Sequence, residues 1–213
     1  MKRIFVGFVL FVAASISLAE PLKIDYPRPS FEDGGPYAIK LRNMEPPRSQ
    51  RPWEFDVPTG CTNLALGRPV SSSDCDPIIG SLDMITDGRK DRGETYLVEL
   101  NAGEQWVQVD LGREPEIYAI LVWHLIGRAH ACKAVIVQLS NDAAFSNGVT
   151  TVFNNDIDNL NGQGAGKDFC YIETNYGKLF DAKGAKARYV RLWSNGNTWN
   201  KMNHYIEVEV WGK

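Results

Sequence analysis

The stretch QWVQVDLGREPEIYAILVWH, residues 105 to 124, decides the fold of this chain. Its first half alternates: Val107, Val109 and Leu111 share one side of an extended chain, and the polar residues between them share the other. After a break at 112–115, almost every position from 117 to 123 is apolar. A strand with one solvated face, followed by a strand buried on both faces, is typical of a β-sandwich interior. We therefore predict a core hairpin here and place the function on the loops that it supports.

The first 19 residues have the pattern of a secretory signal peptide. Lys2 and Arg3 precede an apolar run from Ile4 to Ala14, and small residues stand at the cleavage positions in Ser17-Leu18-Ala19. The apolar run is too short to span a bilayer. We expect cleavage after Ala19 and a soluble product that is secreted, to the periplasm or to the outside of the cell.

Net charge and cysteine content limit the classes of binding partner and the cell compartment that we expect. Without the first 19 residues, 21 basic residues face 26 acidic ones, a net charge of about −5 that disfavours nucleic acid and anionic membrane lipid. Four cysteines in an oxidising compartment suggest two disulfide bonds, although three connectivities are open. The pairing we expect joins Cys61 to Cys75 and Cys132 to Cys170. A metal site is the alternative, but no CxxC spacing occurs.

Residues 20 to 60 differ in composition from the rest of the chain. Eight of the eleven prolines lie here, and proline removes backbone donors and fixes φ. We predict a proline-rich extended arm or linker that precedes a domain at 61–213. Aromatic residues such as Trp53 and Phe55 indicate that part of the arm lies against the domain.

The domain at 61–213 contains short apolar or alternating runs separated by polar turns. Besides the central hairpin, they lie at 63–65, 69–73, 134–140, 150–153, 169–174, 188–193 and 204–211. In the last run Ile206, Val208 and Val210 are expected to point inward, and Tyr205, Glu207 and Glu209 outward. Seven or eight short strands without a helical period predict an all-β sandwich.

Five motifs carry a resemblance to a known family. They are NLALGRPV at 63–70, TDG at 86–88, WVQVDLG at 106–112, RYVRLW at 188–193 and IEVEVWG at 206–212. In this order they resemble the discoidin domains (coagulation factor five/eight type C domains) and the galactose-binding-like family 32 carbohydrate-binding modules. The resemblance implies an eight-stranded jelly-roll β-sandwich, and it does not extend to residues 20–58.

The resemblance also implies a structural calcium ion. Carried over, the carboxylates of Asp87 and Glu207 and the hydroxyl of Thr95 bind the ion, with backbone carbonyls from Met84, Arg89 and Ile206. Thr95 follows Asp87 by eight residues, which departs from the shorter members of the family. Calcium chemistry agrees, because the ion takes six to eight hard oxygen ligands from a turn that bends around it.

A second acidic cluster, Asp156, Asp158 and Asp168, lies in a region rich in Asn, Asp and Gly. It resembles a calcium loop, but it does not fit the EF-hand pattern, because Leu160 and Lys167 occupy ligand positions. Asn and Asp also favour turns for local reasons. A second cation site and an ordinary loop both remain open.

Sugar recognition combines planar hydrogen-bonding groups with an aromatic ring that covers the apolar side of the sugar. If their loops converge, such a set is available in Arg128, His130, Tyr96, Trp199, Asn197 and Asn200. Each also has a structural interpretation, such as packing a loop onto the core. No nucleophile elbow or HExxH motif occurs, so we do not expect an enzyme.

We therefore predict a secreted, non-catalytic binding module whose partner is a glycan or cell-surface polysaccharide. The alternative is an adhesion or docking module that binds a protein partner with the same loops. Lipid binding is a third option, for which Leu125 and Ile126 beside Arg128 are the candidate apolar spikes; the net charge opposes it.

Overall fold

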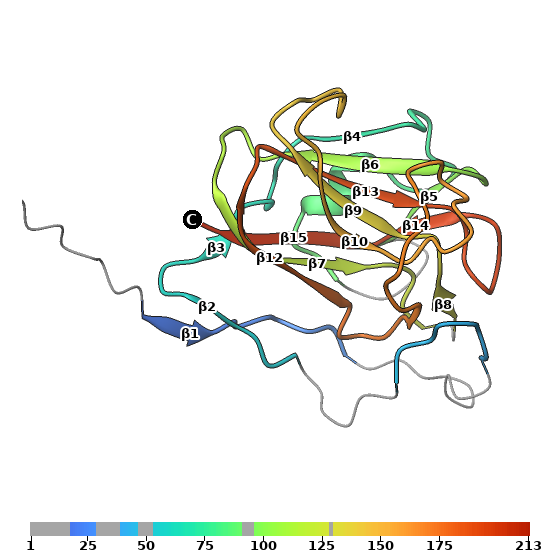
Figure 1. Ribbon diagram of the computed structural model, residues 1–213, viewed down its shortest axis with the longest axis horizontal. Helices are drawn as coiled ribbons and strands as arrows, with labels where there is room; N and C mark the ends of the chain where they lie inside the picture. The colour runs from blue at the N-terminus through green and yellow to red at the C-terminus, as the bar shows by residue number, and fades with distance from the viewer. Residues whose placement is uncertain (1–17, 29–38, 47–52, 91–95, 128–129) are drawn as a thin grey trace, which may run out of the picture.

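The computed structural model describes residues 18–28, 39–46, 53–90, 96–127 and 130–213. Two antiparallel sheets form the body of the molecule, with strand orders β10-β9-β13-β6-β4 and β12-β7-β15-β3 (Figure 1). The first contains β4 (Val70–Ser72), β6 (Gln105–Asp110), β9 (Ile136–Ser140), β10 (Thr150–Asn154) and β13 (Tyr189–Ser194). The second contains β3 (Thr62–Asn63), β7 (Glu116–Trp123), β12 (Lys178–Lys186) and β15 (Glu207–Gly212). The predicted all-β sandwich is confirmed, with nine strands in the described parts of its two sheets instead of eight.

Three two-stranded ladders complete the fold. They pair β1 (Ala19–Pro21) with β2 (Asp56–Pro58), β5 (Val98–Leu100) with β14 (Asn203–Tyr205), and β8 (Ala131–Cys132) with β11 (Tyr171–Ile172). One short 3₁₀ helix, η2 (Leu82–Thr86), precedes the Asp-Gly turn. Among the described residues, no helix has the length and apolar character needed to cross a membrane.

The predicted hairpin is wrong, because β6 pairs with β13 and β4 whereas β7 pairs with β12 and β15 in the other sheet. Strand β7 is buried on both faces, as its apolar run predicts. Ile120 and Val122 pack in the interior between the two sheets. Leu121 and Trp123, on the opposite face, belong to a second apolar cluster that includes Leu22 of the N-terminal arm. The arm is therefore the cover that allows the outer face of this strand to be apolar.

The described parts of the arm lie along the domain. β1 and β2 run beneath the four-stranded sheet, and Val57 in β2 is 3% exposed (Figure 1). Further along, Met44 forms a β-bridge with Cys170, and the indole of Trp53 donates to the carbonyl of Gly177 (3.3 Å). Burial and backbone hydrogen bonds thus hold the arm to the sandwich at several separate points.

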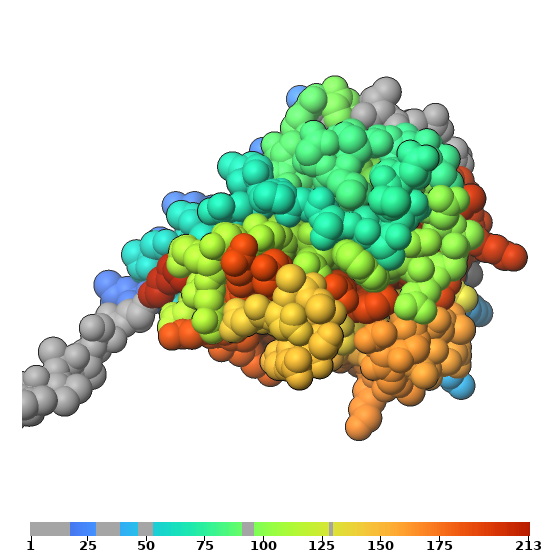
Figure 2. All heavy atoms as spheres, turned by 90° about the horizontal axis from the view of Figure 1, so that it is seen from above, coloured from blue at the N-terminus to red at the C-terminus, as the bar shows by residue number. Residues whose placement is uncertain are grey.

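The outer face of β6 differs from the solvated face that we predicted. Gln108 is only 7% exposed, because its side-chain oxygen accepts two hydrogen bonds from the Arg191 guanidinium (2.9 and 2.6 Å). That guanidinium packs over the rings of Trp106 (4.3 Å) and Phe145 (4.1 Å). Viewed from above this sheet, β13 in red-orange lies between light-green β6 and yellow β9 (Figure 2).

The predicted alternation of the last strand is wrong at its start. Tyr205 lies in the sandwich interior, and Ile206 lies in the arm-side cluster, because the chain bends at Ile206 between β14 and β15. Val208 and Val210 point inward as expected. Glu207 is fully buried (0% exposed) although it points outward from the core.

Neither predicted disulfide bond forms: Cys61, Cys75, Cys132 and Cys170 are all free cysteines. Cys61 precedes β3, near the end of β15 in the four-stranded sheet, whereas Cys75 follows β4 in the five-stranded sheet. The two residues therefore lie beside different sheets, at opposite ends of the sandwich.

The second predicted disulfide bond, between Cys132 and Cys170, does not form because of the strand register. Cys132 is the antiparallel partner of Tyr171, so these two side chains project from the same side of the β8–β11 ladder. Cys170, one residue earlier, projects from the other side. Free cysteines contradict the expectation that export places this chain where disulfide bonds form, so the expectation of export rests on the N-terminal segment alone.

Candidate functional site

One end of the sandwich gathers loops that are far apart in the sequence. Glu99 in β5 is paired with His204 in β14 on one side and forms a β-bridge with Ile79 on the other. Cys132 in β8 forms a β-bridge with Asn197 in the loop that follows β13. We call this region the loop end; it is where the β4–β5, β7–β8 and β13–β14 connections meet.

Trp199 stands at the tip of the loop between β13 and β14, and the residue is 44% exposed. The side-chain oxygen of Asn197 accepts from the backbone N–H of Trp199 (2.8 Å) and of Asn200 (3.1 Å). This local turn fixes the backbone at the tip. The indole ring lies 5.7 Å from the ring of His204, at an interplanar angle of 34°. A supported aromatic surface thus faces solvent.

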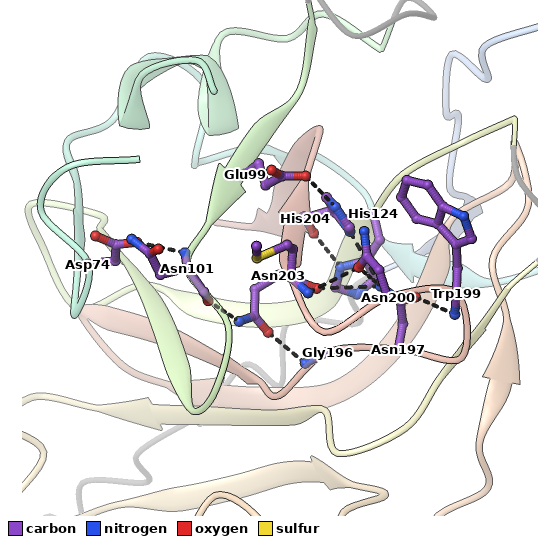
Figure 3. Close-up of polar contacts among 11 residues, drawn as sticks. Asp74, Glu99, Asn101, His124, Gly196, Asn197, Trp199, Asn200, Asn203 and His204 are labelled. Carbon is purple, nitrogen blue, oxygen red and sulfur yellow. Dashed lines mark hydrogen bonds and ion pairs between the residues drawn. The ribbon is translucent and has the colours of Figure 1, made fainter. Parts of the chain in front are cut away.

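His204 connects this aromatic surface to a carboxylate. Its Nε2 lies 2.9 Å from Oε2 of Glu99, and its Nδ1 lies 3.3 Å from the side-chain nitrogen of Asn197. Because the amide of Asn197 donates to Nδ1, the ring proton is assigned to Nε2, which donates to Glu99. Figure 3 shows Glu99 and Trp199 on either side of His204.

Burial determines the protonation of His204. The His204 side chain is 1% exposed and that of Glu99 16% exposed. Desolvation lowers the pKa of His204 below its usual value, although the bond to Glu99 acts in the opposite direction. At neutral pH the imidazole is therefore uncharged, and the partly exposed Glu99 side chain lies between it and solvent.

The asparagines of the loop end mainly support the backbone. Asn200 accepts from the N–H of Met202 (3.0 Å), and Asn203 donates to the carbonyls of Asn101 (2.7 Å) and Gly103 (3.0 Å). These bonds tie the β13–β14 loop to the β5–β6 turn (Figure 3). The predicted contact residues Asn197 and Asn200 thus shape the loop that presents Trp199.

The other predicted contact residues lie at different depths. His130 is at the same end as Trp199, since the next residue, Ala131, exchanges hydrogen bonds with Thr198, but its side chain is only 1% exposed. Tyr96 lies toward the Asp87 turn, where the guanidinium of Arg89 packs 4.0 Å from its ring centre. Arg128 lies outside the described residues.

The predicted calcium ligands come from two segments that the fold brings together. The N–H of Gly88, in the turn after Asp87, donates to Oε2 of Glu207 at the start of β15 (3.1 Å). Oε1 of Glu207 is buried and has no hydrogen-bond partner. Burial raises the pKa of Glu207 to about 9, and the nearby charges of Glu209 and Asp87 act in the same direction.

The remaining predicted ligands are placed around this turn. Met84 belongs to η2, Arg89 follows the turn, and Ile206 donates its N–H to the carbonyl of Trp123 (2.8 Å). Thr95 lies outside the described residues. Asp87 is exposed, and its Oδ1 accepts from the N–H of Arg89 (2.8 Å).

The second acidic cluster does not converge. The carboxylate of Asp156 accepts from the N–H groups of Leu160 (2.8 Å) and Asn161 (2.7 Å). Asp168 accepts from the N–H of Asn154 (2.6 Å), and Asp158 pairs with Arg42 of the arm (3.0 Å). These carboxylates stabilise their own loop, which agrees with the interpretation as an ordinary turn region.

Leu125 and Ile126, the candidates for lipid-binding spikes, are 9% and 7% exposed and belong to the arm-side cluster. They do not project from the surface. Sequence reasoning missed Glu99, whose place in the site depends on pairing with His204, 105 residues later in the chain. No local sequence pattern predicts such a long-range pairing.

Neither the family models nor the curated proteins include a match to this chain. Solved structures do match in fold. A variant of chitosan-binding module 1 from a Paenibacillus chitosanase/glucanase is 20% identical, with a TM-score of 0.51 over 70% of this chain and 98% of that one. The lectin domain of lectinolysin, solved with Lewis B antigen, is 22% identical (TM-score 0.52; 71% and 97% covered).

A fucose-binding module from Streptococcus pneumoniae also matches, at 15% identity, with a TM-score of 0.52 over 71% of this chain and 98% of that one. These identities are low, so the likeness establishes the fold. The chain has the galactose-binding-like β-sandwich fold that carbohydrate-binding modules and lectin domains share. The fold that the five motifs implied is thereby confirmed.

Proposed function

We propose that this protein is a non-catalytic carbohydrate-binding module whose glycan docks at the loop end. The observation that carries the proposal is Trp199, a large aromatic residue 44% exposed at a loop tip and supported from beneath by His204. Exposing a tryptophan forgoes the free energy that burying it provides, and a fixed backbone turn keeps it exposed. The fold neighbours described as binding chitosan, fucose and Lewis B support the same class of ligand.

The chemistry of the loop end suits a pyranose ring. The apolar C–H face of the sugar would stack on Trp199, and the Glu99 carboxylate, held by His204, would accept hydrogen bonds from neighbouring hydroxyls. Both groups are oriented before the ligand arrives, which lowers the ordering cost of binding. The set of direct contacts is small, so we expect weak affinity for a single sugar.

We further propose that calcium binds between the Asp87 turn and the start of β15 and has a structural role. The buried Oε1 of Glu207 supports this, because a desolvated carboxyl oxygen without a partner is costly, and a cation would displace the proton of this group and bind the oxygen. Bound there, the ion would supply positive charge between two segments that are 120 residues apart in the chain. Asp87 would turn toward it from the position where it now caps the Arg89 N–H.

The decisive experiment is a glycan array probed with the purified protein, with calcium and with chelator. The expected result is retention of a defined glycan class by the wild type and its loss in Trp199→Ala. Trp211→Ala is the matched control, because Trp211 is a partly exposed tryptophan at the far end of β15. Absence of any retained glycan, or full retention by Trp199→Ala, would favour the protein-docking alternative.

Export is proposed on the basis of the basic and apolar N-terminal segment. Cleavage after Ala19 would leave the pairing of Glu20 with Val57 intact and Leu22 in its cluster. Intact mass measurement of the exported protein should give a chain that begins at Glu20. A cell-retained protein that keeps residues 1–19 would contradict the proposal.

A further inference from the structure

A second polar cluster lies inside the sandwich, beneath the loop end. It consists of His124 just after β7, Cys132 in β8 and Glu173 just after β11. All three are buried, at 5%, 3% and 3% exposure, and their ligand atoms lie within 4.8 Å of one another. We propose that these three side chains bind a zinc ion.

The three donor groups identify the class of metal. An imidazole nitrogen, a thiolate and a carboxylate form a mixed N, S, O set that zinc accepts and that calcium, which takes only oxygen, does not. The proposed ion is therefore distinct from the calcium ion near Asp87. The two places also lie on different faces of the four-stranded sheet: Glu207 is opposite Trp123 on the arm side, whereas the His124 ring packs 5.3 Å from that of Tyr205 in the interior.

His124 is oriented as a metal ligand would be. Its Nδ1 lies 2.8 Å from the carbonyl oxygen of His204, so that nitrogen carries the proton and donates. Its Nε2 therefore presents a lone pair toward the cluster, where it lies 3.0 Å from the hydroxyl of Tyr171. Metal-bound histidines commonly donate their other ring N–H to a carbonyl in this way. When the ion binds, Nε2 of His124 would coordinate it and would no longer accept a hydrogen bond from the Tyr171 hydroxyl.

The separations suit a tetrahedral centre after a small contraction. Zinc bonds of the usual lengths place neighbouring N, O and S ligands roughly 3.4 to 3.6 Å apart. Sγ of Cys132 lies 3.9 Å from Oε2 of Glu173. Backbone bonds keep the three segments together, including one from the N–H of Glu173 to the carbonyl of His130 (3.1 Å). Side-chain rotation alone can therefore close the remaining gaps.

A fourth coordination position is available on the side of the loop end. A pocket of about 10 Å³, enough for about one water molecule, is lined by His124, His130 and Cys132 and by Met202 of the outer loop. His130 or a water molecule would complete the tetrahedron from this pocket. The same pocket is also lined by Asn197 and His204 of the outer loop and β14.

The polarity of the buried groups is compensated only in part without an ion. Glu173 accepts from the N–H of Thr174 (3.3 Å), and its other oxygen lies 3.9 Å from the thiol of Cys132. A cation with two anionic ligands would compensate both groups at once and would cross-link β7, β8 and β11. Its binding free energy would add to the stability of the folded state.

Cobalt substitution tests the proposal in the intact protein. Metal-free wild type titrated with Co²⁺ should bind one ion per chain and develop a near-ultraviolet thiolate-to-cobalt charge-transfer band, which Zn²⁺ should abolish by displacement. Cys132→Ser should lose the band. Cys170→Ser is the matched control, a neighbouring buried cysteine on the other side of the ladder, and it should keep the band.

A band that persists in Cys132→Ser, or wild type that binds no cobalt in a near-stoichiometric titration, would overturn the proposal. If Cys132→Ser does not fold, X-ray absorption of the zinc-loaded wild type decides the question. One sulfur ligand is expected, and a shell of oxygen and nitrogen alone would contradict the assignment. None of these readouts depends on glycan binding, so this proposal and the proposed function fail separately.

Discussion

The two ends of the sandwich differ in how far their charged and polar side chains are exposed to solvent. At the end where β6 and β13 meet the β12–β13 turn, the ion pairs are exposed: Asp110 and Arg188 have side chains 31% and 44% exposed. At the loop end, Glu207 is fully buried and His204 is 3% exposed. Exposed pairs contribute little to stability, whereas buried polar groups are costly unless they are compensated. The buried polar groups of the loop end are those that the proposed glycan and calcium sites would use.

The largest predicted effect separates Trp123 from Trp199. Trp123→Ala should destabilise the protein by about 3–5 kcal/mol, because this ring is fully buried between the four-stranded sheet and the arm. Trp199→Ala should change stability by no more than about 0.5 kcal/mol while abolishing glycan retention. Urea unfolding beside the array measures both. A large loss of stability in Trp199→Ala would mean that its ring is a core residue.

Calcium removal should have the next largest effect. If free calcium exceeds its dissociation constant a hundredfold, chelation should remove about 2.7 kcal/mol of stability. Glu207→Gln should abolish the difference between the melting curves with and without chelator, because the buried carboxylate would be gone. Asp110→Asn, at the other end, should keep the difference. A wild-type melting curve that does not respond to chelator would rule out the calcium site.

A smaller effect is expected at Glu99. Glu99→Ala should weaken glycan binding about tenfold, the equivalent of losing one hydrogen bond to a charged group. Glu104→Ala, an exposed carboxylate in the adjacent turn, is the control and should bind normally. Isothermal titration compares the two variants. Equal affinity in both would remove Glu99 from the site.

The smallest effect is expected at the opposite end. The Arg188 guanidinium holds the pKa of Asp110 below its usual value, so the pair stabilises the folded state above the unfolded pKa. That stabilisation is lost as the pH falls through the lower, folded pKa. Because both side chains are partly exposed, Asp110→Asn should cost less than about 1 kcal/mol at neutral pH, and less in high salt. A cost well above this value would weaken the contrast between the two ends.

Local pattern predicted the body of the fold. The alternation at 107–111 and the apolar run at 117–123 both correspond to strands with the predicted inner faces. Local pattern did not predict which residues pack over Leu121 and Trp123, because these residues come from the proline-rich arm. Gln108 likewise seemed solvent-facing, since its partner Arg191 is 83 residues later in the chain.

The geometry of the candidate site was predictable where a single loop defines it. Trp199 and its supporting Asn197 lie two residues apart, and their role in one turn follows from local chemistry. The position of Glu99 beside His204 and the burial of His130 depend on which strands pair at the loop end. The residue types alone do not predict this pairing. The cysteine prediction failed for the same reason, because a one-residue offset in register decides which side of the ladder Cys170 faces.

The most direct test of glycan binding at the loop end is a titration followed by the indole N–H signals of the six tryptophans in nuclear magnetic resonance spectra. The signal missing from the Trp199→Ala spectrum identifies Trp199. The account predicts that this signal shifts most as the glycan identified by the array is added, while that of Trp211 stays in place. A bound glycan that leaves the Trp199 signal unmoved would contradict it.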